Sequence, residues 1–173
     1  MGLYLLANGP MQTTAAFAGA QTGTAIKTML QVKLGGSTNM IGKIVEWGIS
    51  FDGSAAATPI KCELISTSTV AATITEFAAA DIINLTDPNA GAVTDDFPFA
   101  FTAAGDESGY TATAEGTITA VRNFDVQFIA PTNQYIKQFP LGREPSFKAA
   151  EFIRIRVTAG TAVDAYCYMV VEV

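Results

Sequence analysis

Apolar and polar residues alternate one by one along most of this chain, which is the pattern of half-buried β-strands. The stretch 44–51 is a clear example, because Val45, Trp47, Ile49 and Phe51 fall on one face of an extended chain. Asp52-Gly53 then supplies residues that favour a turn. We expect a strand here, with Trp47 as a large apolar anchor in the core.

The same alternation predicts further strands. They are expected at 26–34, 60–64, 124–128, 153–157 and 163–173, with weaker ones at 70–77 and 133–139. Residues 73–83 are the best candidate for one helical turn or a short helix. Residues 86–109 and 140–150 are expected to be loops.

Strands without crossover helices predict an all-β domain, either a sandwich or a barrel. The long connections favour a jelly-roll-like β-sandwich, because Greek-key returns need such connections. Residues 9–23 lack a strand pattern. We therefore expect residues 1–24 to form an irregular N-terminal arm and residues 25–173 to form a single β-sandwich domain.

Few charges are available for the surface of this domain. Charged residues make up 15% of the 173 residues, whereas about 25% is typical. Such a domain either hides part of its exterior against copies of itself or relies on Ser, Thr and Gly for solvation, and we favour the first. The net charge of −6 argues against nucleic acid as a direct partner.

The charges are unevenly distributed, since residues 62–121 hold nine acids and neither Lys nor Arg. This segment is either a set of solvated loops or a surface for a basic neighbour or divalent ions. Its possible oxygen ligands for calcium are Asp87, Asn89, Asp95, Asp96, Asp106 and Glu107. They lack the spacing of an EF-hand loop, so we interpret them as solvated and predict no metal site.

Catalytic chemistry is not indicated. The chain has no histidine, the usual general base and metal ligand. The acids near strands are Asp52, Glu63, Asp125 and Glu151, and they fit ordinary strand-face positions. Two cysteines, Cys62 and Cys167, are too few for a disulfide framework or a zinc site and are expected to be buried thiols. We expect no enzyme and no cofactor.

The first residues lack the basic region of a signal peptide, and no run of 18 apolar residues occurs. We therefore expect a protein made and used without secretion and without a membrane partner.

Three arginines are candidates for binding a neighbouring chain, namely Arg143, Arg154 and Arg156. A guanidinium binds a carboxylate through two parallel hydrogen bonds, and that carboxylate could belong to a neighbour. An ion pair within the chain is the alternative.

Several stretches together resemble small proteins of tailed bacteriophages and prophages. They are IVEWGISFDG at 44–53, YTATAEGTITAVR at 110–122 and QYIKQFPLGREP at 134–145, followed by IRIRVTA and CYMVVEV. Such proteins are similar to the decoration or cement proteins that sit as trimers on the outside of an icosahedral head. The resemblance extends from about residue 25 onward and carries no catalytic residues.

The resemblance implies a virion structural protein with a jelly-roll fold. Its partners would be the major capsid protein and copies of itself, as a homotrimer on the capsid exterior, after synthesis in the host cytoplasm. The candidate interface residues come from the arm and the arginine segments: Leu3, Tyr4, Leu5, Leu6, Phe17, Arg143, Glu144, Arg154 and Arg156.

Two other functions stay open. One is a structural protein of the tail or of head completion. The other is a sandwich that binds carbohydrate or a host surface, which predicts exposed aromatic residues in loops at Phe97, Phe99, Phe101 and Tyr110.

Overall fold

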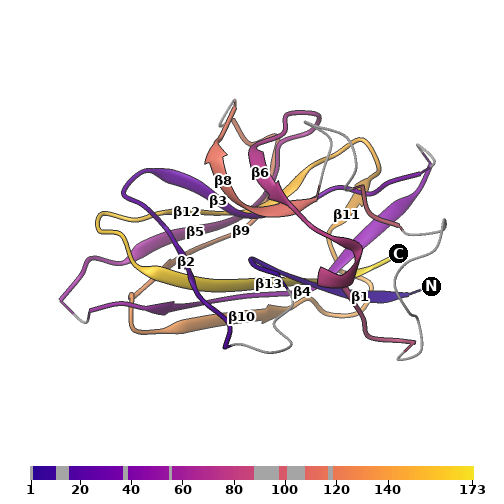
Figure 1. Cartoon of the computed structure of the whole chain (residues 1–173). Coiled ribbons are helices and arrows are strands. Elements are labelled where there is room, and N and C mark those ends of the chain that lie inside the picture. Colours follow the sequence, from indigo (N-terminus) through magenta and orange to yellow (C-terminus); the bar gives the residue numbers. More distant parts are fainter. Residues whose placement is uncertain are drawn as a thin grey trace.

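A computed structural model describes residues 2–10, 16–36, 39–54, 56–87, 98–100, 108–116 and 119–173. In this part of the chain nearly all regular structure is β-strand (Figure 1). The strands are β1 Leu3–Ala7, β2 Ala20–Gln21, β3 Ile26–Val32, β4 Ile41–Asp52, β5 Ile60–Ser66, β6 Thr73–Glu76, β7 Ile83–Asn84, β8 Gly109–Ala114, β9 Arg122–Ile129, β10 Gln134–Gln138, β11 Ser146–Lys148, β12 Ile153–Thr158 and β13 Asp164–Glu172. One 3-10 turn, η1 Ala79–Asp81, lies between β6 and β7.

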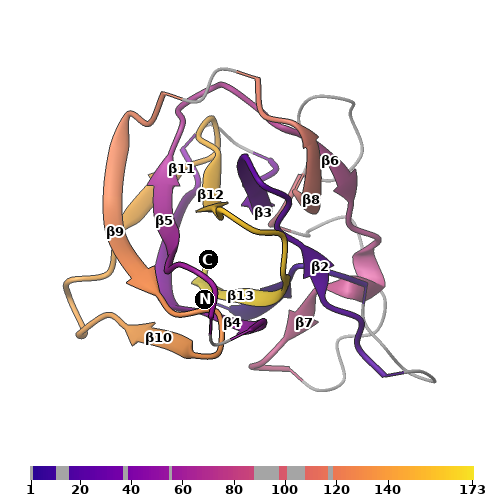
Figure 2. The same cartoon turned by 90° about the vertical axis from the view of Figure 1, so that its left-hand side faces the viewer.

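The strands form two antiparallel sheets that face each other (Figures 1 and 2). Sheet A has the order β10-β4-β13-β1-β7, and β11 and β2 add short pairings to β4 and β13. Sheet B has the order β6-β8-β3-β12-β5-β9. The chain is therefore a β-sandwich, as the alternating pattern predicts.

The order in which the strands pair identifies a jelly roll. β1 pairs with β13, β3 with β12, β4 with β10, and β5 with β9, all antiparallel. Strands from the start of the chain thus pair with strands from its end, and each later pair lies nearer the middle of the chain. This is a long hairpin rolled into two sheets, and it confirms the jelly-roll prediction.

The core fills the space between the sheets. Sheet A contributes Trp47, Cys167 and Met169, each with no exposed surface, and sheet B contributes Leu30 and Ile155, equally buried. Trp47 is thus the core anchor that the sequence predicts. Both cysteines are free and buried, also as predicted. Burial, with the charge of Glu63 adding to it, raises the pKa of Cys62 to about 12, so its thiol stays protonated at neutral pH.

The N-terminal segment differs from the predicted arm. Residues 3–7 form β1, which lies between β13 and β7 inside sheet A. Residues 20–21 form β2, which pairs with β13. Asn8 continues the ladder, since its backbone N donates to Cys167 O at 3.0 Å. Its side chain donates through Nδ2 to Ala165 O at 3.0 Å and accepts from Cys167 N at 2.9 Å. The prediction of an arm over 1–24 is therefore wrong for these strands, and residues 11–15 lie outside the described part.

A β-bulge in β4 places Val45 on the face opposite to the predicted one. Val170 pairs with Glu46 and Val171 pairs with Ile44, so Val45 is the extra residue in β4. Ile44 is consequently buried in the core, whereas Val45 lies on the outer face of sheet A. A strict two-residue period cannot reveal such an insertion.

Two further segments differ in detail. Residues 73–83 hold β6, the single turn η1 and β7, so the helical alternative is limited to one turn. β8, at 109–114, was not expected as a strand. It pairs with β3 and β6 and widens sheet B.

Candidate functional site: the outer face of sheet A

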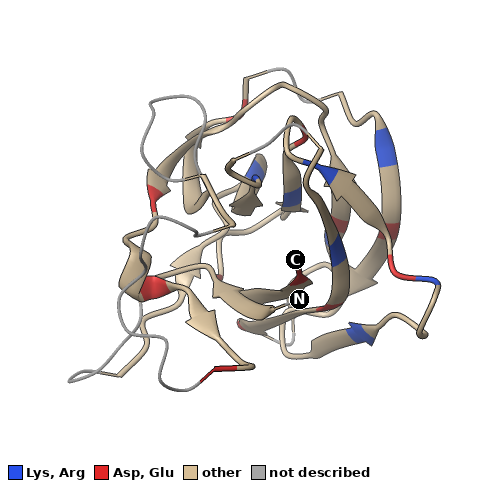
Figure 3. Ribbon diagram, turned by 90° about the vertical axis from the view of Figure 1, so that its right-hand side faces the viewer, with Lys and Arg blue, Asp and Glu red and all other residues tan. Residues whose placement is uncertain are grey.

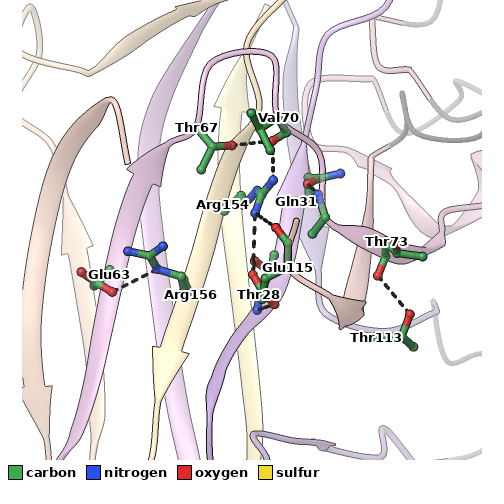
Figure 4. Close-up of polar contacts among 11 residues, drawn as sticks. Thr28, Gln31, Glu63, Thr67, Val70, Thr73, Thr113, Glu115, Arg154 and Arg156 are labelled. Atoms are coloured by element: carbon green, nitrogen blue, oxygen red, sulfur yellow. Dashed lines mark hydrogen bonds and ion pairs between the residues drawn. The ribbon is translucent and has the colours of Figure 1, made fainter. Parts of the chain in front are cut away.

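Arg154 is buried inside this chain and does not reach a neighbour. Its guanidinium donates to Glu115 O at 3.1 Å and to Val70 O, and lies 3.6 Å from the Glu115 carboxylate (Figure 4). That carboxylate also accepts from Thr28 Oγ1 at 2.6 Å. Burial lowers the pKa of Arg154 to about 10, with Glu115 opposing the shift, so the group is charged at neutral pH. The predicted interface role of Arg154 is wrong, and the intrachain alternative holds.

Arg156 is likewise used within the chain. Its Nε donates to Glu63 Oε2 at 3.1 Å, and Lys61 Nζ lies 2.8 Å from the other Glu63 oxygen. Burial by itself raises the pKa of Glu63, but the hydrogen bonds and charges of Lys61 and Arg156 outweigh burial and lower it. Arg156 therefore pairs two strands of sheet B, and its predicted interface role is also wrong.

Asp125 joins the two sheets at one edge of the sandwich. Its Oδ2 accepts from Trp47 Nε1 at 3.2 Å and from Tyr135 Oη at 2.9 Å. Its Oδ1 accepts from Gln127 Nε2 at 2.9 Å and lies 3.3 Å from Lys137 Nζ. A carboxylate that binds four donors is a structural connector between β9, β4 and β10.

The other two acids expected near strands lie in different surroundings. Glu151 pairs with Arg122 at 2.5 Å, and Asp52 lies exposed at the end of β4. Among the described residues no group of three or more Cys, Asp or Glu side chains could hold a metal ion. Of the possible calcium ligands only Asp87 is described, and the other five lie outside the described part. The described part also contains no helix long and apolar enough to cross a membrane.

The outer face of sheet A carries an open groove of about 510 Å³. Three neighbouring strands, β1, β13 and β4, supply most of its wall, with one residue from β10 and one that follows β7. The lining side chains are Leu3, Leu5, Val45, Glu46, Leu85, Gln138, Tyr166, Tyr168 and Val170. Five are aliphatic and a single one is charged, so this face presents apolar surface to solvent.

Tyr168 is fixed flat on the sheet at the centre of this face. A Cβ added to Gly48 would meet Tyr168 Cε1 at 2.5 Å, so the ring occupies the space that a side chain would take. The Tyr168 hydroxyl donates to Glu46 Oε1 at 2.5 Å. Burial raises the pKa of Tyr168, and the hydrogen bond to Glu46 raises it further, so the hydroxyl remains a donor.

A second aromatic pair extends the apolar face. Phe17 lies against Tyr166, with ring centroids 4.8 Å apart and an edge-to-face angle of 87°. Tyr166 in turn lies 6.1 Å from Tyr168. Phe17 is thus placed beside the groove, as its prediction as an interface residue requires.

The loop between β10 and β11 projects beyond the edge of sheet A (Figures 2 and 3). Arg143 N donates to Pro140 O at 2.9 Å, and Gly142 has a φ of +80°. These are the marks of a type II turn, in which the third position needs glycine. Leu141 stands at the second position and is 97% exposed.

The predicted interface residues separate into three groups. Leu3, Leu5 and Phe17 lie at the groove, and Arg143 and Glu144 lie on the projecting loop. Leu6 is fully buried in the core, and Tyr4 packs edge-on against Phe99 at 5.3 Å. Leu6 and Tyr4 therefore stabilise the sandwich, and their prediction as contact residues is corrected together with Arg154 and Arg156.

The aromatic residues expected for carbohydrate binding are placed differently. Phe99 is buried, and Tyr110 packs against Phe77 at 5.4 Å. Phe97 and Phe101 lie outside the described residues.

Residue patterns alone missed much of the groove. Tyr166, Tyr168 and Val170 fall in the strand expected at 163–173, and Leu85 falls in neither an expected strand nor an expected loop. One signal was present, because the solvent face of 163–173 carries two tyrosines and a valine where polar residues are expected.

Comparison with known proteins does not assign the chain to a family. No protein-family model matches the chain, and neither a curated protein nor a solved structure matches it.

Proposed function

We propose that this chain is a structural protein of a phage virion, which binds the outside of the head as an oligomer and stabilises it. The observation that supports the proposal is the mostly apolar groove on the outer face of sheet A of a jelly roll. Contiguous exposed apolar surface marks contact sites for other molecules. The assembly that we propose is a phage head, because residues 44–53, 110–122 and 134–145 resemble capsid-associated phage proteins.

The lining of the groove favours a protein partner over a sugar. Carbohydrate recognition combines aromatic platforms with several polar groups, whereas five of the nine lining side chains are aliphatic. Aliphatic and aromatic side chains with few charges are typical of the centre of a protein interface. Tyr166 and Tyr168 fit such a centre, since tyrosine is enriched there.

Binding to viral particles tests the proposal. The gene is deleted from the virus that encodes this chain, and the recombinant protein is added back to the purified particles. We expect saturable co-sedimentation of the protein with the heads and a higher temperature of head disruption. Absence of the protein from wild-type particles, together with no binding on add-back, would contradict the proposal. Binding to isolated tails only would favour the tail alternative.

A further inference from the structure

We infer that the turn Pro140–Arg143 of one copy of this chain seats in the sheet A groove of a second copy. This inference rests on the proposed function, because it names the contact through which the oligomer forms. The partner is thus another copy of the same chain, and Leu141 is the side chain that enters the groove.

The turn has the shape of an inserting element. Its backbone is closed by the hydrogen bond from Arg143 to Pro140, and Pro145 follows shortly after. Leu141 is nearly fully exposed on this turn, at 97%. A single exposed leucine is ordinary on a protein surface. A rigid turn that holds one is different, because little conformational freedom is lost when it binds.

The groove is complementary to the turn in apolar character and in size. Leu3, Leu5 and Val170 come from adjacent strands and form an aliphatic wall. The volume of about 510 Å³ lies within the range of about 300–1,000 Å³ that holds a drug-sized ligand, and a tight turn with one leucine is of that size.

The charges are complementary as well. Glu46 is the one charged residue of the groove lining, and Arg143 is exposed two positions beyond Leu141. A guanidinium and a carboxylate at the edge of an apolar contact fix its orientation. Glu46 already holds Tyr168, and a carboxylate has capacity for further donors. The same turn thus carries the apolar and the basic group that the groove matches.

The positions of turn and groove permit a closed assembly. The turn leaves sheet A beside the groove, because Gln138 lines the groove and Phe139 N donates to Val45 O at 2.9 Å. It then projects away from its own chain (Figure 3). Since turn and groove are two different patches, each copy can give a turn to one neighbour and receive one from another. Such head-to-tail contacts form a ring, the trimer included, when the rotation between neighbouring copies closes.

Sedimentation velocity of the full-length protein tests this contact. We expect the wild type to associate and Leu141→Ser to weaken association about 10- to 100-fold, the loss for one leucine removed from an apolar contact. Phe128→Ser is the matched control, since Phe128 is 72% exposed on β9 of sheet B, and it should associate like the wild type. A monomeric wild type at 100-fold the concentration used for particle binding, or unchanged association of Leu141→Ser, would overturn the inference.

A charge exchange identifies the groove as the acceptor. Arg143→Glu and Glu46→Arg should each weaken association of the variant with itself. An equimolar mixture of the two should associate more tightly than either alone, because the reversed turn then meets the reversed groove. Both variants are checked by circular dichroism, and Arg143→Glu changes only an exposed turn residue. Absence of recovery in mixtures of folded variants would contradict the pairing.

The two proposals fail in different ways. If Leu141→Ser associates normally and the protein still binds heads, the inference is wrong and the proposed function stands. If the protein associates through Leu141 but no viral particle contains it, the contact is correct and the proposed function is wrong.

Discussion

Single buried carboxylates hold together parts of the sandwich that are distant in the sequence. Asp125 contacts residues of β4 and β10 from its place in β9, and Glu63 joins Arg156 of β12 to β5. Each is shielded from solvent, at 7% and 3% exposure. Removing such a group leaves its partners buried without a hydrogen bond, which is costlier than the bond itself is worth.

Replacing Asp125 should loosen the edge between the sheets. Asp125→Ala leaves the indole N–H of the fully buried Trp47 without an acceptor, and we expect a loss of about 2–3 kcal/mol in the free energy of unfolding. Urea unfolding followed by tryptophan fluorescence measures it directly, because Trp47 is the single tryptophan. Asp125→Asn keeps one oxygen for Trp47 and Tyr135 and should lose less. Equal stability of the alanine variant and the wild type would contradict this role.

Glu63 should make stability depend on acid pH. Its pKa is lowered in the folded state from an ordinary value of 4.5, so the stabilisation is present above pH 4.5 and is lost as pH falls through the lower folded pKa. Glu63→Gln should lose about 2–4 kcal/mol at pH 7, since Arg156 stays buried without its counter-charge. The difference from the wild type should shrink below pH 4.5. Glu76→Gln, at an exposed position of β6, is the control and should be neutral at both pH values.

At the scale of elements, the N-terminal strand is part of the sheet. β1 lies between β13 and β7, and its successive side chains point to opposite faces of sheet A. Leu6 is buried in the core, whereas Leu5 lines the groove. Of these two adjacent leucines, Leu6 therefore packs in the core, and Leu5 is placed for the proposed contact with a second copy.

Substitution of these two leucines separates the roles. Leu6→Ala creates a core cavity and should lower the free energy of unfolding by about 2–5 kcal/mol. Leu5→Ala removes side-chain atoms from an open groove, so we expect a loss under about 1 kcal/mol together with weaker association. Thermal denaturation and sedimentation of both variants provide the test. A large loss of stability for Leu5→Ala would show that Leu5 packs in the core.

The alternating pattern predicted β4, β12 and β13 because their inner faces are apolar over several residues. In β9 the faces are reversed, since Val126 and Phe128 are exposed while Asp125 is buried between the sheets. The pattern correctly placed Trp47, Ile49 and Phe51 in the core. It could not reveal the bulge at Val45, because one inserted residue reverses the faces without changing the composition. It also missed β1 as a sheet member, since LYLLA is apolar on both faces and shows no alternation.

The candidate site was predictable only in part, for a related reason. Leu3, Leu5, Phe17 and Arg143 were predicted as contact residues, but from their segments rather than from a common surface, and their role in contact stays a prediction. Arg154 and Arg156 carry the same side chain as Arg143, and only the covering loop at Val70 and the partner Glu63 show that they are internal. Sequence alone does not say what lies over a strand.

At the scale of the whole molecule, the described part carries an open, mostly apolar groove on sheet A, and sheet B is covered only in part. Val70 and Glu115 bind the buried Arg154 of sheet B, whereas Phe128 of β9 in the same sheet is 72% exposed. A face buried in the proposed oligomer would account for the scarcity of charges, at 15% of residues.

The most direct test of the proposed function is a cryo-electron microscopy reconstruction of phage particles produced by cells that carry the gene for this chain. The account predicts jelly-roll density on the outside of the head, with neighbouring copies in contact through the outer face of sheet A. A reconstruction in which that density is absent, or in which the sheet A face is open to solvent, would contradict it.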